Sequence, residues 1–406
     1  MYYCKSCGVG LSFFATSVCE KCTSDIDVNK AITNYFHRGY PYDVIVSILD
    51  KQMGFKMCVR TLKRRLQSLG LRRKGNAQRM DEGRLKAIVQ EEMKGPGKLA
   101  GYRSIWHALR LRHGIHVPRN EVAKIMKEID PAGVNSRKKR RLKRRTFCSR
   151  GPNDSWHMDG YDKLKPYGFP IHGAIDGFSR RILWLEVVKS NNDPRVPGKL
   201  FLEYVKEVGG CPLLLVSDCG TENGIAAAMQ CTFRSSGQDD QAGESSHRYC
   251  SSPANQRIEG WWSFLRHNRS SWWMDLFKDM LVHGTLHVGN TLHMECLWFY
   301  FAKILQEDLN KVRDLWNSHR ITKSGHSTVE GVPDVMYYLP EYYSMEECLV
   351  SVSTQQALDM EQHCELVEEE NVYQEYFEYI LDTEGLNYPS NVEEALQLFQ
   401  RVIDLN

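Results

Sequence analysis

The sequence predicts a multidomain α/β protein with an α/β core at residues 152–330 and mainly helical segments on either side. Two observations predict this class. Within the core, segments of strand composition surround one helical segment, whereas the flanking segments place apolar residues at helical spacing. A chain of 406 residues with 42% hydrophobic residues allows two to four domains, each with a real core.

The core begins with three predicted strands at residues 154–164, 170–176 and 180–189, which are rich in Ile, Val, Trp and Leu. A helix is predicted over residues 200–210, where apolar residues recur at helical spacing and a Gly-Gly pair ends the pattern. Residues 212–218, PLLLVSD, form an apolar run of strand length. Such a run is typical of a strand buried on both faces.

Three acidic residues lie in short strings of this core: Asp159 in WHMDG, Asp218 in VSDCGTENG and Glu259 in ANQRIEGWW. Mg²⁺ is typically held by one or two carboxylates together with phosphate and water oxygens. A pair of such ions can activate the attacking oxygen and stabilise the leaving oxygen at a phosphodiester. Three carboxylates from separate segments suffice to hold that pair, so this chemistry requires no covalent protein nucleophile.

Glu259 belongs to a predicted helix that starts near the Ser-Pro pair of SSPANQRIEGWWSFLRHN. One face of this helix is apolar and carries Ile258, Trp261, Trp262 and Leu265. Glu259 shares a different stripe with Ser263 and Arg266. A carboxylate and a cation on one side of a helix suit a polyanionic, metal-bound substrate.

Four strings together resemble the active-site segments of DDE integrases and transposases. WHMDG resembles the first-strand segment of retroviral and transposon integrases, and IDGFSR resembles their second-strand turn. SDCGTENG resembles their Asp-x-Gly-x-Glu segment, and SSPANQRIEGWWSFLR their Ser-Pro-x-x-Asn-x-x-x-Glu helix. The resemblance covers residues 152–330 and is to the retroviral-integrase-like core domains of eukaryotic genomes.

The resemblance implies an RNase H-like catalytic core in which the first and fourth strands are neighbours, so that Asp159 lies beside Asp218. It implies that Asp159, Asp218 and Glu259 are catalytic residues that bind two Mg²⁺ or Mn²⁺ ions. It also implies double-stranded DNA as substrate, both element ends and target, and a homo-multimer as the working form. A lone Asp at a strand end is usually a cap or turn former, and Asp176 is assigned that role.

The first 25 residues predict a structural zinc module. Two CxxC pairs, Cys4 with Cys7 and Cys19 with Cys22, are separated by eleven residues. Two such pairs can complete a closed tetrahedral Zn²⁺ site. The alternatives are two disulfides or four unrelated cysteines, but no secretory signal is recognised and the other cysteines are scattered, which favours a reducing compartment.

Residues 26–75 predict a helix-turn-helix DNA-binding unit, with a helix through Phe36, a second over residues 42–52, a turn at Gly54 and a third over residues 59–69. The third helix has an apolar face of Leu62, Leu66 and Leu69. The residues predicted to contact DNA are Arg60, Lys63 and Arg64 on its other face, together with Arg257 and Arg266 in the core. The alternative is a small helical bundle with a solvated basic face.

A second helical unit is predicted over residues 76–131. One helix carries Ile105, Leu109 and Leu111, a turn follows at Gly114, and a further helix carries Val122, Ile125 and Met126. This arrangement resembles the winged-helix-like unit that precedes the catalytic core of insertion-sequence transposases. It would provide a second element that contacts DNA.

A basic linker, residues 132–151, connects these units to the core. Its segment SRKKRRLKRR contains eight cations and no acid. Such a run is usually solvated, and here we expect a nuclear localisation signal, a phosphate-binding segment, or both. We therefore predict a nuclear protein.

The C-terminal tail, residues 331–406, is predicted to be acidic and mainly helical. Residues 341–406 contain sixteen acidic residues and one basic residue, whereas residues 1–340 contain 52 basic and 34 acidic residues, a net charge of +18. The tail either competes with DNA for the basic surface, binds a host protein, or only aids solubility. The apolar stretch at residues 296–305 is too short to cross a membrane, so no membrane partner is expected.

The sequence thus predicts a DNA integrase or transposase that cleaves a 3′ end and transfers the strand. Two alternatives stay open: a captured mobile element that binds DNA without integrating it, and a nuclease with the same fold. All three share the triad of acidic residues.

Overall fold

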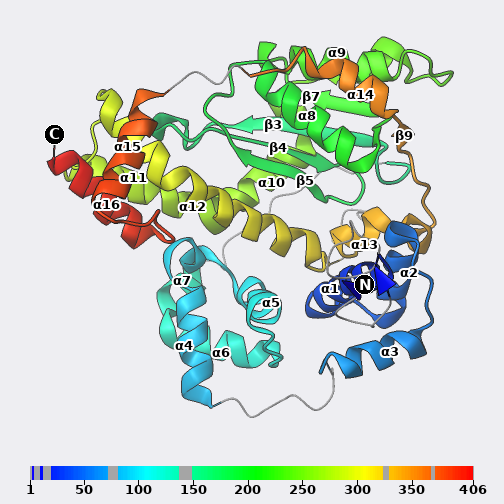
Figure 1. Cartoon of the computed structure of the whole chain (residues 1–406), viewed down its shortest axis with the longest axis horizontal. Helices are drawn as coiled ribbons and strands as arrows, with labels where there is room; N and C mark the ends of the chain where they lie inside the picture. The colour runs from blue at the N-terminus through cyan, green and yellow to red at the C-terminus, as the bar shows by residue number, and fades with distance from the viewer. Residues whose placement is uncertain are drawn as a thin grey trace. The chain divides into compact units, whose positions relative to one another are not determined.

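The computed structural model describes residues 2–3, 10–11, 20–71, 81–136, 149–322, 329–366 and 371–405. By its internal contacts the chain divides into two compact units. Unit 1 comprises Met1–Met93 and Gly101–Lys139, and unit 2 comprises Lys94–Ala100 and Arg140–Asn406 (Figure 1). None of the described helices has an apolar stretch long enough to span a lipid bilayer.

Unit 1 is mainly helical. Its elements are β1 (Tyr2–Tyr3), β2 (Gly10–Leu11), α1 (Glu20–His37), α2 (Tyr42–Met53), α3 (Val59–Ser68), α4 (Glu82–Glu92), α5 (Tyr102–His113), α6 (Arg119–Ile129) and α7 (Pro131–Ser136). The α2 and α5 helices end at Gly54 and Gly114, both in the left-handed conformation that glycine adopts at low cost. Both turns lie where the sequence predicts them.

The α3 helix has the expected amphipathic character, with one exception. Leu62 and Leu66 are buried, and the cationic face is exposed. Leu69, which is predicted to continue the apolar face, is 38% exposed, so that part of the prediction is wrong. The reason is that α3 ends at Ser68 and Leu69 lies in the turn that follows, where helical spacing no longer determines which residues face inward.

Unit 2 contains a five-stranded mixed sheet. Its strands are β3 (Ser155–Tyr161), β4 (Ile171–Asp176), β5 (Ile182–Val187), β7 (Leu214–Ser217) and β8 (His247–Tyr249), arranged in the order β5-β4-β3-β7-β8. The β3, β4 and β5 strands pair antiparallel, whereas β3 with β7 and β7 with β8 pair parallel. The predicted neighbourhood of the first and fourth strands is confirmed, and the sheet fits an RNase H-like core.

Helices cover both faces of this sheet. Further elements of unit 2 are η1 (Gly95–Leu99), α8 (Arg195–Val208), α9 (Gly224–Phe233), α10 (Gln256–Leu265), η6 (Arg266–Ser270), α11 (Ser271–Val282), α12 (Thr291–Ser318), α13 (Pro333–Tyr338), α14 (Thr354–Glu361), α15 (Val372–Thr383) and α16 (Val392–Asp404). A short strand, β6 (Gly210–Cys211), pairs with β9 (Val350–Ser351).

The α10 helix begins at Gln256, because residues Ser252–Ala254 form a separate 3₁₀ turn instead of its first turn.

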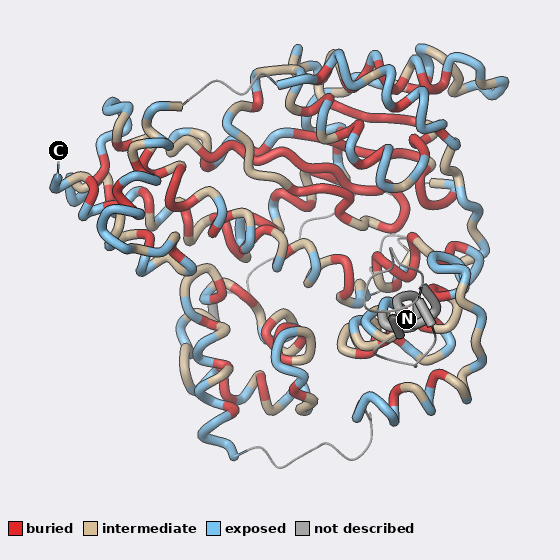
Figure 2. The backbone as a smooth tube through the Cα atoms, in the orientation of Figure 1, coloured by how far each residue is buried: buried red, intermediate tan, exposed pale blue. Residues whose placement is uncertain are grey.

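The two faces of the sheet contribute to different hydrophobic clusters. Trp156 and Met158 pack with residues of α8, α9 and α14, whereas Tyr161 packs with residues of α10, α11 and α12. Side chains alternate along a strand, so residues 155, 157, 159 and 161 of β3 share the α10 face. The central strands β3 and β4 are buried along most of their length (Figure 2). The α15 and α16 helices pack on α12 through Phe377 and Phe399, beside the C-terminus (Figure 1).

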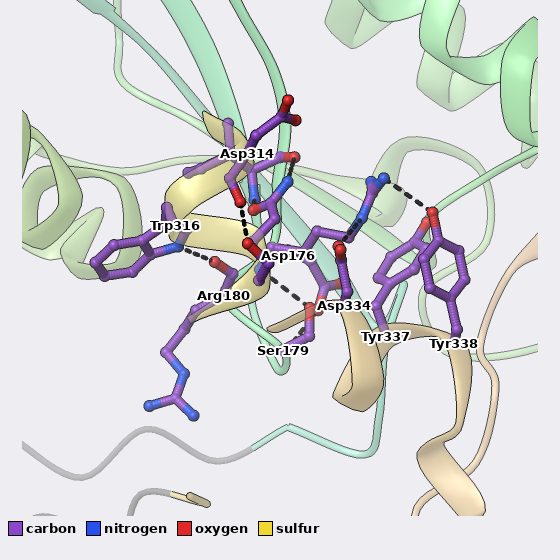
Figure 3. Close-up of polar contacts among 12 residues, drawn as sticks. Asp176, Ser179, Arg180, Asp314, Trp316, Asp334, Tyr337 and Tyr338 are labelled. Carbon is purple, nitrogen blue, oxygen red and sulfur yellow. Dashed lines mark hydrogen bonds and ion pairs between the residues drawn. The ribbon is translucent and has the colours of Figure 1, made fainter. Parts of the chain in front are cut away.

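The turn between β4 and β5 is held by a buried polar network (Figure 3). Oδ2 of Asp176 accepts hydrogen bonds from the backbone N and the Oγ of Ser179, at 2.7 and 2.6 Å. Arg181 forms an ion pair with Asp334 at 3.0 Å and donates to the Tyr338 hydroxyl at 2.9 Å. Asp176 is therefore a turn residue, as predicted, and the network joins the turn to α13.

The outer edge of β5 is covered by two amide side chains of α12. Asn317 accepts from the backbone N of Ile182 at 2.8 Å and donates to its carbonyl oxygen at 2.9 Å. Gln306 accepts from the backbone N of Val187 at 2.7 Å and donates to the Leu185 carbonyl at 3.0 Å. An open strand edge is a template for pairing with other chains, and these side chains occupy it.

Candidate active site

Asp159 and Asp218 lie on neighbouring parallel strands. In the β3–β7 ladder, Trp156 pairs with Leu215 and His157 with Val216. Continuing this register by two residues places Asp159 opposite Asp218, which directly follows β7. Because residues at equivalent positions of paired strands point to the same face, both carboxylates belong to the face that α10 covers.

A tryptophan of α10 binds the carboxylate of Asp159. Nε1 of Trp262 donates a hydrogen bond to Oδ2 of Asp159 at 2.9 Å, and both residues are buried. Trp262 is three residues beyond Glu259, so the two residues lie about one turn apart on the same helix. The hydrogen bond therefore sets the position of Glu259 relative to Asp159.

Space for this indole comes from Gly173, which pairs with Asp159 across the β3–β4 ladder. A Cβ atom at Gly173 would lie 2.9 Å from Cη2 of Trp262 and 3.3 Å from Cδ1 of Leu185. Such a distance is shorter than van der Waals contact, so any larger residue would displace the ring. Gly173 thus permits the close approach of α10 to the sheet.

The start of α10 is joined to β3 by Asn255. Its Oδ1 lies 2.8 Å from Nδ1 of His157, and its Nδ2 donates to the carbonyl oxygen of Met158 at 3.1 Å. Asn255 and His157 are buried, and burial lowers the pKa of His157 to about 4, so that the imidazole is neutral near pH 7. This contact connects α10 to the residues that immediately precede Asp159.

Asp218 is oriented by the segment that follows it. Its Oδ1 accepts hydrogen bonds from Nδ2 of Asn223 at 2.7 Å and from the backbone N of Gly220 at 3.2 Å. The side chain of Glu222 lies over Gly220, where a Cβ would come within 2.1 Å of its Oε1. The short 3₁₀ helix Thr221–Asn223 therefore packs directly against Gly220.

Two of the three carboxylates have raised pKa values. The pKa of Asp159 is raised to about 7, mainly by burial; the hydrogen bond from Trp262 opposes this rise, and the negative charges of Glu259 and Asp218 add to it. Burial and the charge of Asp218 also raise the pKa of Glu259, and Lys163 partly offsets this. Mutual repulsion of this kind is relieved by a bound cation.

The donor set fits divalent metal ions that prefer oxygen. Carboxylates are the ligands of Mg²⁺ and Mn²⁺, and their mutual repulsion is a further reason for a cation to bind here. Within the described parts of the chain, no three His, Cys, Asp or Glu side chains are already gathered around one point. A site of this class needs only one or two carboxylates per ion, because phosphate and water oxygens complete the shell.

The other predicted site residues are distributed over both units. Arg60, Lys63 and Arg64 are exposed on α3 in unit 1. In unit 2, Arg266 is exposed directly after α10, and Arg257 is half-buried within that helix. The predicted zinc ligands Cys4, Cys7 and Cys19, the side chain of Cys22 and the basic run that begins after Ser136 lie outside the described residues.

Four residues that contact the triad or its supports are absent from the sequence-based site. They are His157, Asn223, Asn255 and Trp262. Each lies within one of the strings that carry the resemblance, two to five residues from an acidic residue. That proximity is a signal, but only the hydrogen bonds show which of the neighbours bind the carboxylates and their strand.

A comparison with protein families identifies the segment that contains this site. Residues 146–338 match the family model described as the integrase core domain. The matched range includes all five strands of the sheet, α10 and α12. A comparison of the chain with curated proteins gives no match.

Proposed function

We propose that the protein is a polynucleotidyl transferase of the DDE type that cleaves a DNA 3′ end and transfers the strand to a target, because residues 146–338 match the model of the integrase core domain. One observation supports this proposal most: the β3–β7 register sets Asp159 opposite Asp218 on the face covered by the helix of Glu259. Three separate segments thereby contribute carboxylates to one face of the sheet. These are the residues that we assign as catalytic.

Asp159, Asp218 and Glu259 would hold two Mg²⁺ or Mn²⁺ ions. When bound, such a pair activates an attacking oxygen and stabilises the charge on the leaving oxygen. The residues of this chain supply position: Trp262 holds Asp159, Asn223 holds Asp218, and Asn255 joins α10 to β3. Catalysis then depends on orientation and charge neutralisation and requires no covalent protein intermediate.

The proposed reaction has two steps in one site. Water first attacks a phosphodiester near the end of an element, and the bond to the leaving oxygen breaks to release a 3′ hydroxyl. That hydroxyl then attacks a phosphodiester of the target, so that one P–O bond forms as another breaks. Because two element ends must be joined to the same target, the proposed working form is a homo-multimer.

DNA is the proposed substrate on grounds of charge as well as family. Residues 1–340 carry a net charge of +18. The exposed residues Arg60, Lys63 and Arg64 are proposed to contact DNA from α3, and Arg257 and Arg266 to contact it beside Glu259. Each phosphate neutralised by such a residue releases a counterion, so binding is expected to weaken steeply with salt.

Two further assignments belong to this proposal. Cys4, Cys7, Cys19 and Cys22 are proposed to bind one structural Zn²⁺ ion, on the spacing of the two CxxC pairs. The basic run between residues 137 and 145 is proposed to direct the protein to the nucleus, where its substrate lies.

The decisive experiment is a strand-transfer assay with labelled DNA ends, the full chain and Mg²⁺ or Mn²⁺. Joined products are expected from the wild type, and Asp218→Asn should abolish them while DNA binding stays nearly unchanged. Asp275→Asn is the matched control, since Asp275 is an exposed carboxylate on α11. Cut but unjoined products would indicate a nuclease, and DNA binding without cutting would indicate a captured DNA-binding protein.

A further inference from the structure

Two cysteines flank the candidate active site. Cys219 directly follows Asp218, and Cys250 directly follows β8. The β7–β8 ladder ends with Ser217 paired to Tyr249, and the backbone N of Cys250 donates to the Ser217 carbonyl at 2.9 Å. Cys250 therefore lies opposite Asp218, one residue from Cys219.

Each of the two side chains lies close to the backbone of the neighbouring segment. Sγ of Cys219 lies 3.7 Å from the carbonyl oxygen of Cys250, and Sγ of Cys250 lies 3.4 Å from the carbonyl oxygen of Ser217. Neighbouring strands are about 4.8 Å apart, a spacing that a disulfide can bridge. Disulfides span Cα separations of about 4.4–6.8 Å.

Accessibility distinguishes Cys219 from the other described cysteines of unit 2. Cys219 is exposed and Cys250 is half-exposed, and both are free thiols. Cys211, Cys296 and Cys364 are buried, which keeps a dissolved oxidant away from them. Thiol oxidation follows exposure of the sulfur atom, so Cys219 is the first of these thiols that we expect to react.

We propose that Cys219 and Cys250 are a dithiol pair that closes to a reversible disulfide and thereby inactivates the adjacent carboxylate site. The oxidant is a small-molecule disulfide such as oxidised glutathione. The Cys219 thiolate attacks one of its sulfur atoms, which forms a mixed disulfide and releases one glutathione thiolate. The Cys250 thiolate then attacks the Cys219 sulfur and releases the second glutathione; the two protein thiols lose two electrons and two protons in total.

The disulfide acts on Asp218 through the loop that orients it. Closing the bond requires the Cys219 sulfur to leave the Cys250 carbonyl and turn toward the Cys250 sulfur. Cys219 is bonded directly to Gly220, whose backbone N donates to Asp218, and the same loop carries Asn223. A covalent bond at Cys219 would therefore shift this loop and move both donors away from the Asp218 carboxylate.

The proposal concerns regulation of the site and rests on the proposed function, so its test includes measurements that do not depend on DNA cleavage. The folded full chain is incubated with glutathione disulfide in excess over glutathione, digested without reduction and examined by mass spectrometry. We expect a linked pair of peptides containing Cys219 and Cys250, reversed by dithiothreitol. Hydrogen exchange of residues 217–225 should increase on oxidation as the Gly220 hydrogen bond is lost.

Metal binding and cleavage complete the test. Oxidation should weaken Mn²⁺ binding by about tenfold or more, the usual cost of losing groups that orient a metal ligand. Cys219→Ser and Cys250→Ser should keep the reduced properties under oxidising conditions. Cys231→Ser is the matched control, since Cys231 is a cysteine of α9 that is exposed to a similar degree as Cys250 and does not belong to the proposed pair; this variant should be inactivated like the wild type.

Each outcome decides a separate question. Absence of the Cys219–Cys250 linkage in folded protein would overturn the proposal, as would a linkage that leaves both hydrogen exchange and Mn²⁺ binding unchanged. A third outcome separates the two proposals. If oxidation forms the linkage and increases hydrogen exchange, but the reduced protein does not cleave DNA, the proposed function fails while the disulfide-driven change at Asp218 stands.

Discussion

Nε1 of Trp262 donates a hydrogen bond to Oδ2 of Asp159 at 2.9 Å, across 103 residues of sequence. The donor lies on α10 and the acceptor on β3, so a single contact relates two of the three acidic segments. It opposes the rise in the pKa of Asp159 that burial causes. Through this hydrogen bond, Trp262 of α10 belongs to the candidate active site together with Glu259.

Replacing Trp262 with Phe tests that contact. The variant keeps an aromatic ring but loses the donor, so Mn²⁺ affinity should fall by about 10- to 100-fold, as for other groups that orient a metal ligand. Isothermal titration measures the affinity. Trp261→Phe is the control, because Trp261 is equally buried and its Nε1 has no hydrogen-bond partner among the described residues. Equal affinities in the two variants would contradict the role of Trp262.

Gly173→Ala should displace the Trp262 ring, since the added Cβ would lie 2.9 Å from it. We expect the free energy of unfolding to fall by about 1–3 kcal/mol, the usual cost of overpacking a core. Urea denaturation measures this. Gly224→Ala is the control: nothing lies within 4 Å of its added Cβ, its φ of −61° is ordinary, and the change should be neutral or slightly stabilising.

Asn255 and His157 should be coupled in a double-mutant cycle. Asn255→Ala removes the partner of Nδ1 of His157 and a donor to the Met158 carbonyl, and should cost about 1–3 kcal/mol of stability. His157→Ala and the double variant complete the cycle, with an expected coupling of about 0.5–3 kcal/mol. Mn²⁺ affinity is measured in parallel. Additive effects on stability would mean that the two side chains act independently.

Asn317→Leu should destabilise unit 2 by exposing the edge of β5. Both backbone groups of Ile182 lose their partner, and each buried unpaired group costs about 1–3 kcal/mol. Urea denaturation reports the loss, and light scattering is expected to show increased association through the freed edge. Asn310→Leu is the control: Asn310 lies on the same helix and, among the described residues, its side chain accepts from Gln306 and bonds to no group of β5, so this variant should behave nearly as the wild type.

His172 should make stability depend on pH. Burial lowers the pKa of His172 to about 4, and Nε1 of Trp184 donates to its Nδ1 at 3.0 Å, so the folded protein holds the neutral ring. The unfolded chain binds a proton below about pH 6.5, so stability is lost as pH falls from 6.5 toward 4. This loss is up to about 3 kcal/mol, since one pKa unit corresponds to about 1.4 kcal/mol.

The corresponding variant is His172→Gln, whose amide oxygen can still accept from Trp184. Urea unfolding at pH 7 and pH 4.5 should show a smaller difference for this variant than for the wild type. His283→Gln is the control, because His283 is exposed and its replacement should leave the pH dependence unchanged. A wild-type difference that persists in full in His172→Gln would assign the effect to other groups.

Several elements of the core follow from local pattern. The predicted strands at residues 154–164, 170–176 and 180–189 contain β3, β4 and β5, and the apolar run before Asp218 is β7. The helix stops at Gly54 and Gly114 follow from the low cost of left-handed glycine. Such features depend on the conformation and burial of consecutive residues, which composition and periodicity record directly.

Other features depend on contacts between distant segments. Gly173 is an ordinary strand glycine in the sequence, yet it accommodates the ring of Trp262. Cys219 and Cys250 are 31 residues apart and meet only because β7 and β8 pair in parallel. The α15 and α16 helices of the acidic segment pack on α12, although their sequences are equally compatible with a detached tail.

The sequence by itself determined the identity of the three acidic residues, the strands and helix that carry them, and the resemblance of their surroundings to integrase cores. Only the tertiary structure decided the relation between these parts: the β3–β7 register that sets Asp159 opposite Asp218, and the contacts of Trp262, Asn255 and Asn223 that orient the site. The physical reason is that register and side-chain contact arise from the packing of segments far apart in the chain. Local periodicity specifies which face of an element is apolar, but not which element that face will meet.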